Sequence, residues 1–333
     1  MTFFGGVEVP PLRPSFHIHA TRSDFKGICM KKRKYIGIEK KEARWGFAFT
    51  VPAILFFCIF SFYPILNALF TSLFDKRVLS LAPPDFMGLG NYTYIFSSPD
   101  FWNSIRATFV FTLGTFIPIV IFSLMLAAFL TNIRSKKMRG VFQIAYYTPA
   151  VISSVVAATI WLLIFDPRGL GNQWVNLLLN TPGVDQKWLA DRTMVQLSTM
   201  IVYFWKYIGY FVVLFITGLA AIPPAIYEAA TIDGSSKWQS FWRITLPLLK
   251  PTVVLVSIMA MLQCLKTFST QYLFVQGGAP RAPINVITLN IYTTGIRNQR
   301  IGRASAMSIV LFLIMLLFTW MQFRFSKSEE VEY

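Results

Sequence analysis

Charged residues are scarce in this sequence. Only 14% of its 333 residues are Asp, Glu, Lys or Arg, whereas soluble domains carry about 25%. In contrast, 55% of the residues are hydrophobic and 32 are Phe. This deficit of charge, together with several long apolar runs, excludes an ordinary soluble domain and places the chain among membrane proteins.

Cysteine and histidine are scarce too. The three cysteines, Cys29, Cys58 and Cys264, lie far apart and form no CxxC pair. We interpret them as small apolar residues and not as redox groups or metal ligands. The two histidines, His17 and His19, lie in the N-terminal tail. The sequence therefore excludes a histidine-based metal site within the membrane.

The net charge of +16 is of the size seen in nucleic-acid-binding proteins. A simpler interpretation is that cations gather at the cytoplasmic ends of membrane spans, and we expect no nucleic-acid partner. The first apolar run is too long for a signal peptide and has no small-residue cleavage site after it, so we expect it to remain as a membrane helix. Met30, just before the basic cluster 31–34, is an alternative start of translation, so the sequence leaves open whether residues 1–29 are translated.

The apolar runs predict an all-α, polytopic membrane bundle of six transmembrane helices. Each run has about 20 or more mostly apolar residues, enough to cross ~30 Å of hydrocarbon. Prolines such as Pro149 are expected to be tolerated as kinks. Tails 1–45 and 325–333 flank a membrane domain, 46–324, whose predicted spans are 46–73, 103–130, 142–166, 195–221, 249–275 and 304–324.

The distribution of basic residues predicts that both tails are cytoplasmic. With the N-terminus inside, 19 of the 31 Lys and Arg residues fall on the cytoplasmic side, ten fall outside and two lie within spans. Such a bias is typical of cytoplasmic loops. The last outside loop is an exception, because it holds Arg281, Arg297, Arg300 and Arg303. The outside loops are too short for a sizeable soluble domain, so we expect a separate protein to capture the substrate.

The cytoplasmic loop 222–247 has the chemistry of two short helices. Pro223 and Pro224 suit a helix start, and Asp233-Gly234 suits a turn. Ser235 or Ser236 can cap the second helix, and Pro247 is expected to end it. The second helix carries an apolar stripe of Trp238, Phe241 and Trp242. The stripe favours a partner groove, although a helix lying on the bilayer surface is the alternative.

Within this loop a motif resembles that of a known family. The pattern EAA-x3-G-x9-I-x-L-P is the EAA motif of permeases in binding-protein-dependent ABC importers, and its spacing is intact here. In that family the loop docks in a cleft of the ATPase subunit. The resemblance therefore implies an ATPase-coupling role for Glu228, Ala229, Ala230, Asp233, Gly234, Trp238, Phe241, Ile244, Leu246 and Pro247.

Further segments resemble the carbohydrate branch of this family, which includes permeases for maltose, glycerol-3-phosphate and alginate. They cover most of the chain after residue 45. Two mild departures are an extra Ala in Gly-Gly-Ala-Pro and Gly234-Ser235 where Gly-Ala is usual. The matching segments are Gly88–Tyr92, Gly171-Asn172, Trp188–Asp191 and Gly277–Pro280.

The resemblance implies a set of partners in the bacterial inner membrane. Such permeases are similar in pairing with a second permease subunit, two ATPase subunits and an external solute-binding protein. This chain has no G-x-x-x-x-G-K-[ST] loop to cradle phosphates. We therefore expect no cofactor and no enzymatic activity in this chain, with ATP and Mg bound by the partner ATPase.

Two lysines lie inside predicted spans. An ionised lysine at mid-bilayer costs roughly 2.5–3.5 kcal/mol, so Lys206 and Lys266 should face a cavity lined by protein. Both are expected at a similar depth in adjacent spans, and those spans contain no carboxylate. An anion bridging the two ammonium groups is one interpretation. The alternative is an ion pair with an acidic residue of a partner subunit.

Aromatic and hydrogen-bonding side chains surround these lysines, a combination that suits sugar rings, although the aromatic residues could simply pack between helices. The maltose permeases bear sugar contacts on the spans before and after the EAA loop. Counted from Glu228, four residues of this chain match contact positions there, and lysine at position 206 is a departure that suggests an acidic sugar. The predicted substrate-binding residues are Tyr203, Lys206, Tyr207, Tyr210, Gln263, Lys266, Thr267 and Ser269.

The sequence thus predicts one transmembrane subunit of an ATP-driven importer that moves a sugar or oligosaccharide by alternating access. A secondary, ion-coupled sugar transporter is the alternative, but the spans lack charge pairs for proton coupling and show no inverted repeat. An intramembrane enzyme is a third class, for which Ser269 near Lys266 is the one weak candidate.

Overall fold

The computed structural model describes residues 38–80, 83–133 and 135–326. The chain divides into two compact units, Met1–Phe62 and Tyr63–Tyr333. In the first unit, α1 (Ile38–Phe57) leads into a π-helical turn, Cys58–Phe62. Most of the two predicted tails, with His17, His19 and Cys29, lies outside the described residues.

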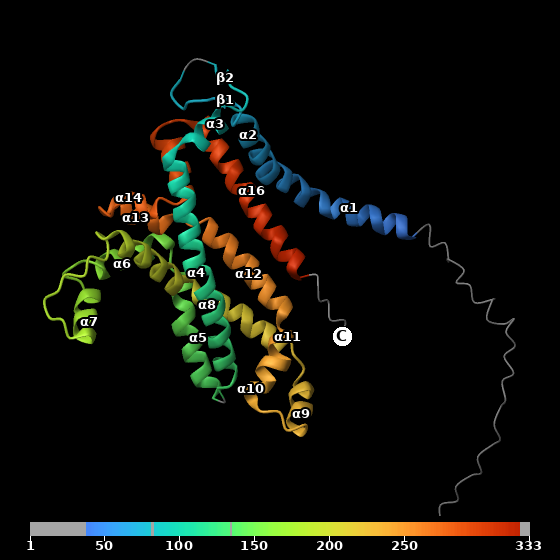
Figure 1. Ribbon diagram of the computed structural model, residues 1–333. Helices are drawn as coiled ribbons and strands as arrows, with labels where there is room; N and C mark the ends of the chain where they lie inside the picture. Colours follow the sequence, from blue (N-terminus) through green and yellow to red (C-terminus); the bar gives the residue numbers. More distant parts are fainter. Residues whose placement is uncertain (1–37, 81–82, 134, 327–333) are drawn as a thin grey trace, which may run out of the picture. The chain divides into compact units, whose positions relative to one another are not determined.

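The second unit is almost entirely helical (Figure 1). Among its described residues, the one sheet is a short antiparallel pair in which Phe74 faces Phe86 and Asp75 faces Asp85. π-helical turns occur at Phe241–Thr245 and Thr293–Arg297. In chain order the elements are α2 (Tyr63–Thr71), β1 (Phe74–Asp75), β2 (Asp85–Phe86), α3 (Gly90–Ser97), α4 (Pro99–Thr131), α5 (Lys136–Val151), α6 (Ser154–Ile164), α7 (Leu170–Leu179), α8 (Arg192–Ala220), α9 (Pro224–Ile232), α10 (Lys237–Ser240), α11 (Leu246–Leu248), α12 (Lys250–Leu265), α13 (Ser269–Gln276), α14 (Arg281–Ile284), α15 (Ile287–Tyr292) and α16 (Ile301–Ser326).

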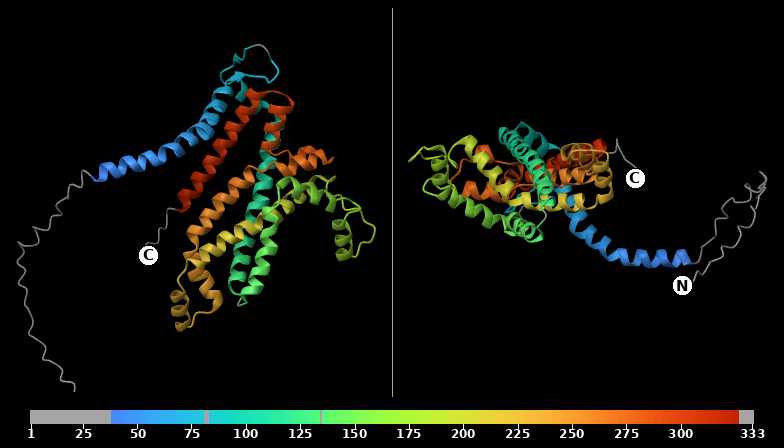
Figure 2. Two further views of the ribbon diagram at one scale, coloured as in Figure 1. Left: turned by 180° about the vertical axis from the view of Figure 1, so that it is seen from behind. Right: turned by 90° about the horizontal axis from the view of Figure 1, so that it is seen from below.

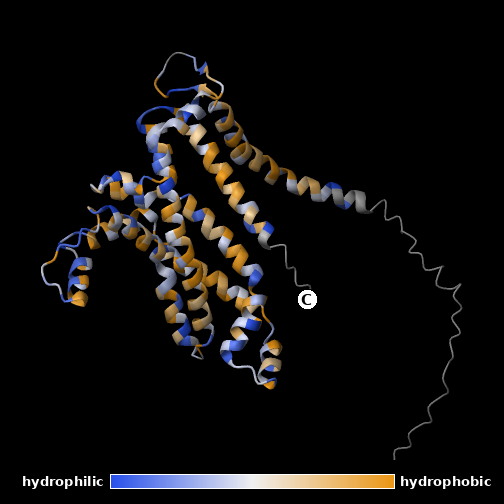
Figure 3. Ribbon diagram, viewed as in Figure 1, coloured by the Kyte–Doolittle hydropathy of each residue, from blue (hydrophilic) through white to orange (hydrophobic). Residues whose placement is uncertain are grey.

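The helices confirm five of the six predicted spans. In the described part of the chain, five helical segments are long and apolar enough to cross a membrane, and a sixth is possible if one bent pair counts as a span. Apolar residues run along these helices, as Figure 3 shows for α12 and α16. The segments are Arg44–Thr71, Pro99–Thr131, Arg192–Ala220, Lys250–Gln276 and Ile301–Arg324, and the bent pair is Lys137–Val151 with Ser154–Ile164.

The third span is not the simple kinked helix that the sequence predicted over 142–166. Its two halves, α5 and α6, meet at an angle of 101°. Ile152 and Ser153 are extended, with ψ angles of 140° at both. Pro149 lies in the last turn of α5, where its ring removes one backbone donor. The break leaves backbone groups around residue 152 without helical partners.

Close helix packing holds the second unit together around α4, α8 and α12. Gly209 on α8 lies against the backbone of α5, so that a Cβ there would sit 2.1 Å from the Tyr146 carbonyl oxygen. Gly218 on α8 allows similar contact with Thr252 on α12. Small residues permit this approach, and dispersion then stabilises the helix pairs. The core between these helices includes Phe111, Phe211, Phe215 and Val256.

Connecting segments gather at two opposite ends of this unit. The α4–α5 connection and the α9–α10 hairpin lie at one end, and the β1–β2 pair lies at the other, where α16 begins (Figures 1 and 2). This agrees with their predicted assignment to opposite sides of the membrane. Asn91, in a segment matched to the family, is 2% exposed and donates to the Ser72 and Phe74 carbonyls at 2.8 and 2.9 Å. Its role is therefore to hold the β1–β2 end together.

Candidate functional site: a cavity between broken helices and a coupling hairpin

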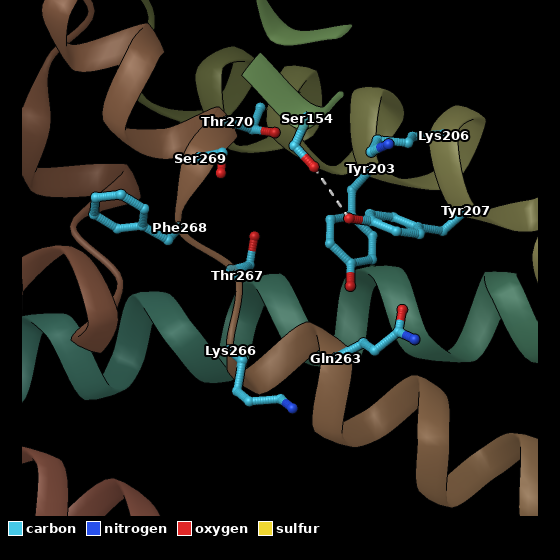
Figure 4. A pocket seen from close by; sticks show the side chains of 10 residues that line it. All are labelled: Ser154, Tyr203, Lys206, Tyr207, Gln263, Lys266, Thr267, Phe268, Ser269 and Thr270. Atoms are coloured by element: carbon cyan, nitrogen blue, oxygen red, sulfur yellow. Dashed lines mark hydrogen bonds between the residues drawn. The ribbon is translucent and has the colours of Figure 1, made fainter. Parts of the chain in front are cut away.

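A cavity of about 300 Å³ lies between α6, α8 and the junction of α12 with α13. Figure 4 shows its walls. Every side chain that lines it is polar or aromatic, and none is a carboxylate. The lining residues are Ser154, Tyr203, Lys206, Tyr207, Gln263, Lys266, Thr267, Phe268, Ser269 and Thr270.

Two breaks in the helices create this cavity. Ser154 begins α6 just after the bend in span three, and Lys266 to Phe268 separate α12 from α13 in span five. Irregular backbone at membrane depth is tolerated where it lines a cavity and finds other partners. Here Thr288 donates from its hydroxyl to the Thr267 carbonyl.

Lys206 is bound to the backbone of span three. Its side chain is 5% exposed, and its ammonium group donates a hydrogen bond to the Ile152 carbonyl at the α5–α6 break. The ammonium nitrogen also lies 5.0 Å from the centre of the Tyr207 ring, a cation–π distance. An unpaired helical carbonyl and a buried cation thus stabilise each other.

Lys266 is placed differently. It follows the last residue of α12 and is exposed. In Figure 4 the two lysines lie on opposite sides of Tyr203 and Tyr207, so they do not face one another directly. The expectation that one anion bridges both ammonium groups therefore does not fit this arrangement. Two anionic groups spaced along one ligand fit it better.

The tyrosines form the middle of the cavity. The Tyr203 and Tyr207 ring centres are 4.4 Å apart, and the Tyr207 hydroxyl lies 3.2 Å from the Ser154 hydroxyl. Tyr203 also packs edge-on against Phe111 of α4. These contacts orient the rings, leaving faces and hydroxyls that suit a sugar ring.

Seven of the eight predicted substrate-binding residues line this cavity. Tyr210 does not, because it packs against the core beside Phe211, with ring centres 5.2 Å apart. The residues that the sequence did not point to are Ser154 and Thr270, together with the ring of Phe268. Ser154 carried no signal, since it reaches the cavity only through the 101° bend.

The hairpin formed by loop 222–247 has the predicted two-helix form. Pro223 precedes α9 and Pro224 is its first residue, and α10 begins after Ser236, which forms a capping box with Gln239. Gly234 takes the positive φ angle of +76° at the turn. The amide of Ser235 donates to the Ala230 carbonyl at 2.9 Å, which closes the end of α9 in the manner of a Schellman motif.

Pro247 does not end the second helix, which is a correction to the prediction. The chain continues from α10 through the π-helical turn 241–245 into α11 and then α12. Pro247 stands in the first turn of α11, where a missing N–H costs little. The hairpin is therefore joined to α12 by an almost uninterrupted helix.

The hairpin exposes a small apolar surface, defined here as Ile232, Trp238 and Trp242. Their exposed fractions are 86%, 71% and 50%. Trp242 packs against Trp238 and Phe241, with ring centres 5.6 and 5.5 Å apart. Of the other motif residues, Glu228, Ala229, Asp233 and Pro247 are exposed, Ala230 is buried, and Ile244 and Leu246 are half-buried.

Comparisons with known proteins agree with this architecture. Residues 104–330 match the family model for the binding-protein-dependent transport system inner membrane component. A probable ABC transporter permease protein, YurN, of Bacillus subtilis (strain 168) is 32% identical over 86% of this chain and 97% of its own length. The arabinooligosaccharides transport system permease protein AraP of the same organism is 30% identical over 85% of this chain and 88% of its own length.

A solved structure shows the same fold. A chain of a bacterial alginate ABC transporter, crystallised with a periplasmic protein that binds an alginate pentasaccharide, superimposes with a TM-score of 0.73 at 21% identity. The match covers 85% of this chain and 94% of that chain. Given the family match, the two relatives and this fold, the chain belongs to the family of binding-protein-dependent transport system inner membrane components and is a multi-pass permease subunit of an ABC importer.

Proposed function

We propose that this permease imports an oligosaccharide that carries carboxylates, and that the cavity between the broken spans is where the ligand binds. The observation that carries the proposal is the composition of the cavity wall. Tyrosines, hydroxyls and two lysines line it without any carboxylate among the lining residues. Relatives that carry arabinooligosaccharides, lactose or trehalose/maltose by their names support a sugar ligand, and the lysines favour an acidic one.

Alternating access requires partners that this chain lacks. We propose a second, related permease subunit beside it, two ATPase subunits on the cytoplasmic side, and an external binding protein that delivers the ligand. The apolar surface Ile232/Trp238/Trp242 would enter the ATPase cleft, because bulky apolar groups in water favour a partner groove. The nearly continuous helix from Lys237 to Leu265 offers a stiff connection from the hairpin to the Lys266 side of the cavity.

We propose that both termini, and with them the tails 1–45 and 325–333, are cytoplasmic. The hairpin then faces the cytoplasm, and the β1–β2 end faces the outside. The basic-residue bias supports this orientation.

Co-purification tests the coupling role. The tagged permease is purified with its partner subunits, and ATPase activity is measured with and without the binding protein. Changing both Trp238 and Trp242 to Ala should abolish ATPase association and binding-protein stimulation. The matched control is Trp174→Ala on α7, where the exposed fraction of the tryptophan, 63%, lies between those of Trp238 and Trp242. Retained ATPase association in the double variant would contradict the docking role.

Uptake assays test the ligand. The assembled importer should take up a uronate oligosaccharide, and Lys266→Gln should raise the apparent KM about tenfold or more, the effect of losing one charge-assisted hydrogen bond. Assembly should be unchanged, because Lys266 is exposed in the cavity. Uptake of a neutral oligosaccharide but of no uronate oligosaccharide would contradict the proposal of an acidic ligand. It would not contradict the assignment to the importer family.

A further inference from the structure

The four arginines that break the positive-inside pattern differ in their partners. Arg281 pairs with Asp100 at 3.5 Å, and Arg300 pairs with Asp75 at 3.7 Å. The guanidinium of Arg303 lies 3.5 Å from the centre of the Tyr94 ring. Arg300 and Arg303 therefore stabilise the β1–β2 end and α3, and Arg281 links α14 to α4. Arg297 is exposed and takes part in none of the ion pairs found among the described residues.

Arg297 instead approaches an aromatic cluster, defined here as Phe268, Tyr272 and Tyr292. Its guanidinium lies 6.0 Å from the centre of the Tyr272 ring. Phe268 stacks on Tyr272 at 5.2 Å with 21° between the ring planes, and Tyr292 lies 5.3 and 5.2 Å from these two rings. Three half-buried rings, two from span five and one from α15, thus end at a cation for which the described residues provide no ion pair.

The aromatic cluster borders the ligand cavity. Phe268 belongs both to the cavity wall described above and to a second hollow of about 430 Å³, which Tyr292 also lines. In Figure 4 the Phe268 ring is directed away from Tyr203 and Tyr207. The second hollow is bounded by small and apolar side chains of α16 and the turn before it, among them Gly295, Ala304 and Ser305. Phe268 therefore separates the cavity from a second hollow that reaches Gly295, two positions before Arg297.

We propose that Arg297 and the aromatic cluster form an outer binding position for a uronic acid residue of the transported oligosaccharide. The rings would contact the apolar face of the sugar, and the guanidinium would bind its carboxylate through two parallel hydrogen bonds. The proposal rests on the acidic ligand proposed above. It adds a position on the outer side, where an oligosaccharide longer than the inner cavity would place its next acidic residue.

A charge-matched pair of variants tests this inference. Arg297→Gln removes a cation just before α16 and Arg303→Gln removes one in its first turn, but only Arg297 borders the aromatic cluster. Uptake of a uronate tetrasaccharide and of a uronate disaccharide is measured in proteoliposomes holding the complete importer. Arg297→Gln should raise the apparent KM for the tetrasaccharide about tenfold or more and change that for the disaccharide much less. Arg303→Gln should leave both values near wild type, and Arg297→Lys should recover part of the loss.

Three results would overturn the inference. Equal apparent KM values for the tetrasaccharide in the two glutamine variants would contradict the outer binding position but not the role of the inner cavity. Failure of Arg297→Gln to co-purify with the other subunits would show that Arg297 pairs with a partner subunit instead. Import of a neutral tetrasaccharide but of no uronate by the wild-type importer would contradict the proposal of an acidic ligand, and with it the outer binding position.

Discussion

Lys206 donates its ammonium hydrogen bond to a carbonyl 54 residues away in the sequence, at the point where span three breaks. The group is therefore part of the fold as well as of the cavity wall. Lys266 lines the same cavity but is exposed, and no hydrogen bond from its side chain to another helix is found among the described residues. The two lysines, alike in the sequence, should respond differently to mutation.

We expect Lys206→Met to destabilise the subunit by about 1–3 kcal/mol, because it leaves the half-buried Ile152 carbonyl without its donor. Lys266→Met should leave stability nearly unchanged. The melting temperature of the purified complex in detergent distinguishes them. Equal melting temperatures for the two variants would show that the Ile152 hydrogen bond contributes nothing to stability.

Gly209 allows the close contact of α5 with α8. A methyl group at this position would meet the Tyr146 carbonyl oxygen at 2.1 Å, so Gly209→Ala should force the helices apart at a cost of about 1–3 kcal/mol. Gly140→Ala is the control, since that glycine of α5 has open space around its Cβ position and alanine favours the helix by up to ~1 kcal/mol. Thermal unfolding should show a lower melting temperature for Gly209→Ala but not for Gly140→Ala. Similar decreases in both variants would contradict the close contact at Gly209.

At the scale of elements, the hairpin α9–α10 and the bent span α5–α6 depend on different kinds of signal. The hairpin is built from local signals: prolines at the start of α9, a glycine turn and a serine cap. The bend has a weaker local signal, Pro149, and depends on Lys206 from another helix for its free carbonyl. This difference explains why the hairpin could be predicted in detail and the bend could not.

Gly234→Val should uncouple ATP hydrolysis from transport. The φ angle of +76° is costly for a β-branched residue, by roughly 1–2 kcal/mol, so the turn would change shape. Gly183→Val places the same strain, at φ +80°, in the loop after α7. It should keep ATPase subunits bound and stimulated. Full binding-protein stimulation in Gly234→Val would be incompatible with a coupling role for this turn.

For the whole molecule, the distribution of charge predicts which end faces the cytoplasm. A cysteine at Asp185 should react with a membrane-impermeant maleimide added outside intact cells, whereas a cysteine at Lys137 should react only after the membrane is opened. Cys29, Cys58 and Cys264 are first replaced by Ser to remove background labelling. The reverse pattern would overturn the orientation and, with it, the cytoplasmic position of the hairpin.

The sequence by itself determined the membrane class, the extent of the spans and the hairpin. Apolar length and basic-residue counts are properties of continuous segments, and turn or cap residues act within a few positions of themselves. The predicted spans therefore agree with the observed helices to within about four residues at nearly every end. The identity of most cavity residues was also predictable, because the polar groups of spans four and five stand out in an apolar background.

Only the tertiary structure decided how those residues meet. The break at Lys266–Phe268 and the 101° turn after Val151 open the space that Ser154 and Phe268 enter. Tyr210, only three positions after Tyr207, is turned into the core instead. The separation of the two lysines by the tyrosine pair, and the contact of Arg297 with Tyr272, likewise depend on helices that are remote in sequence. Such contacts follow from the packing of whole helices against one another, which no local pattern of residues specifies.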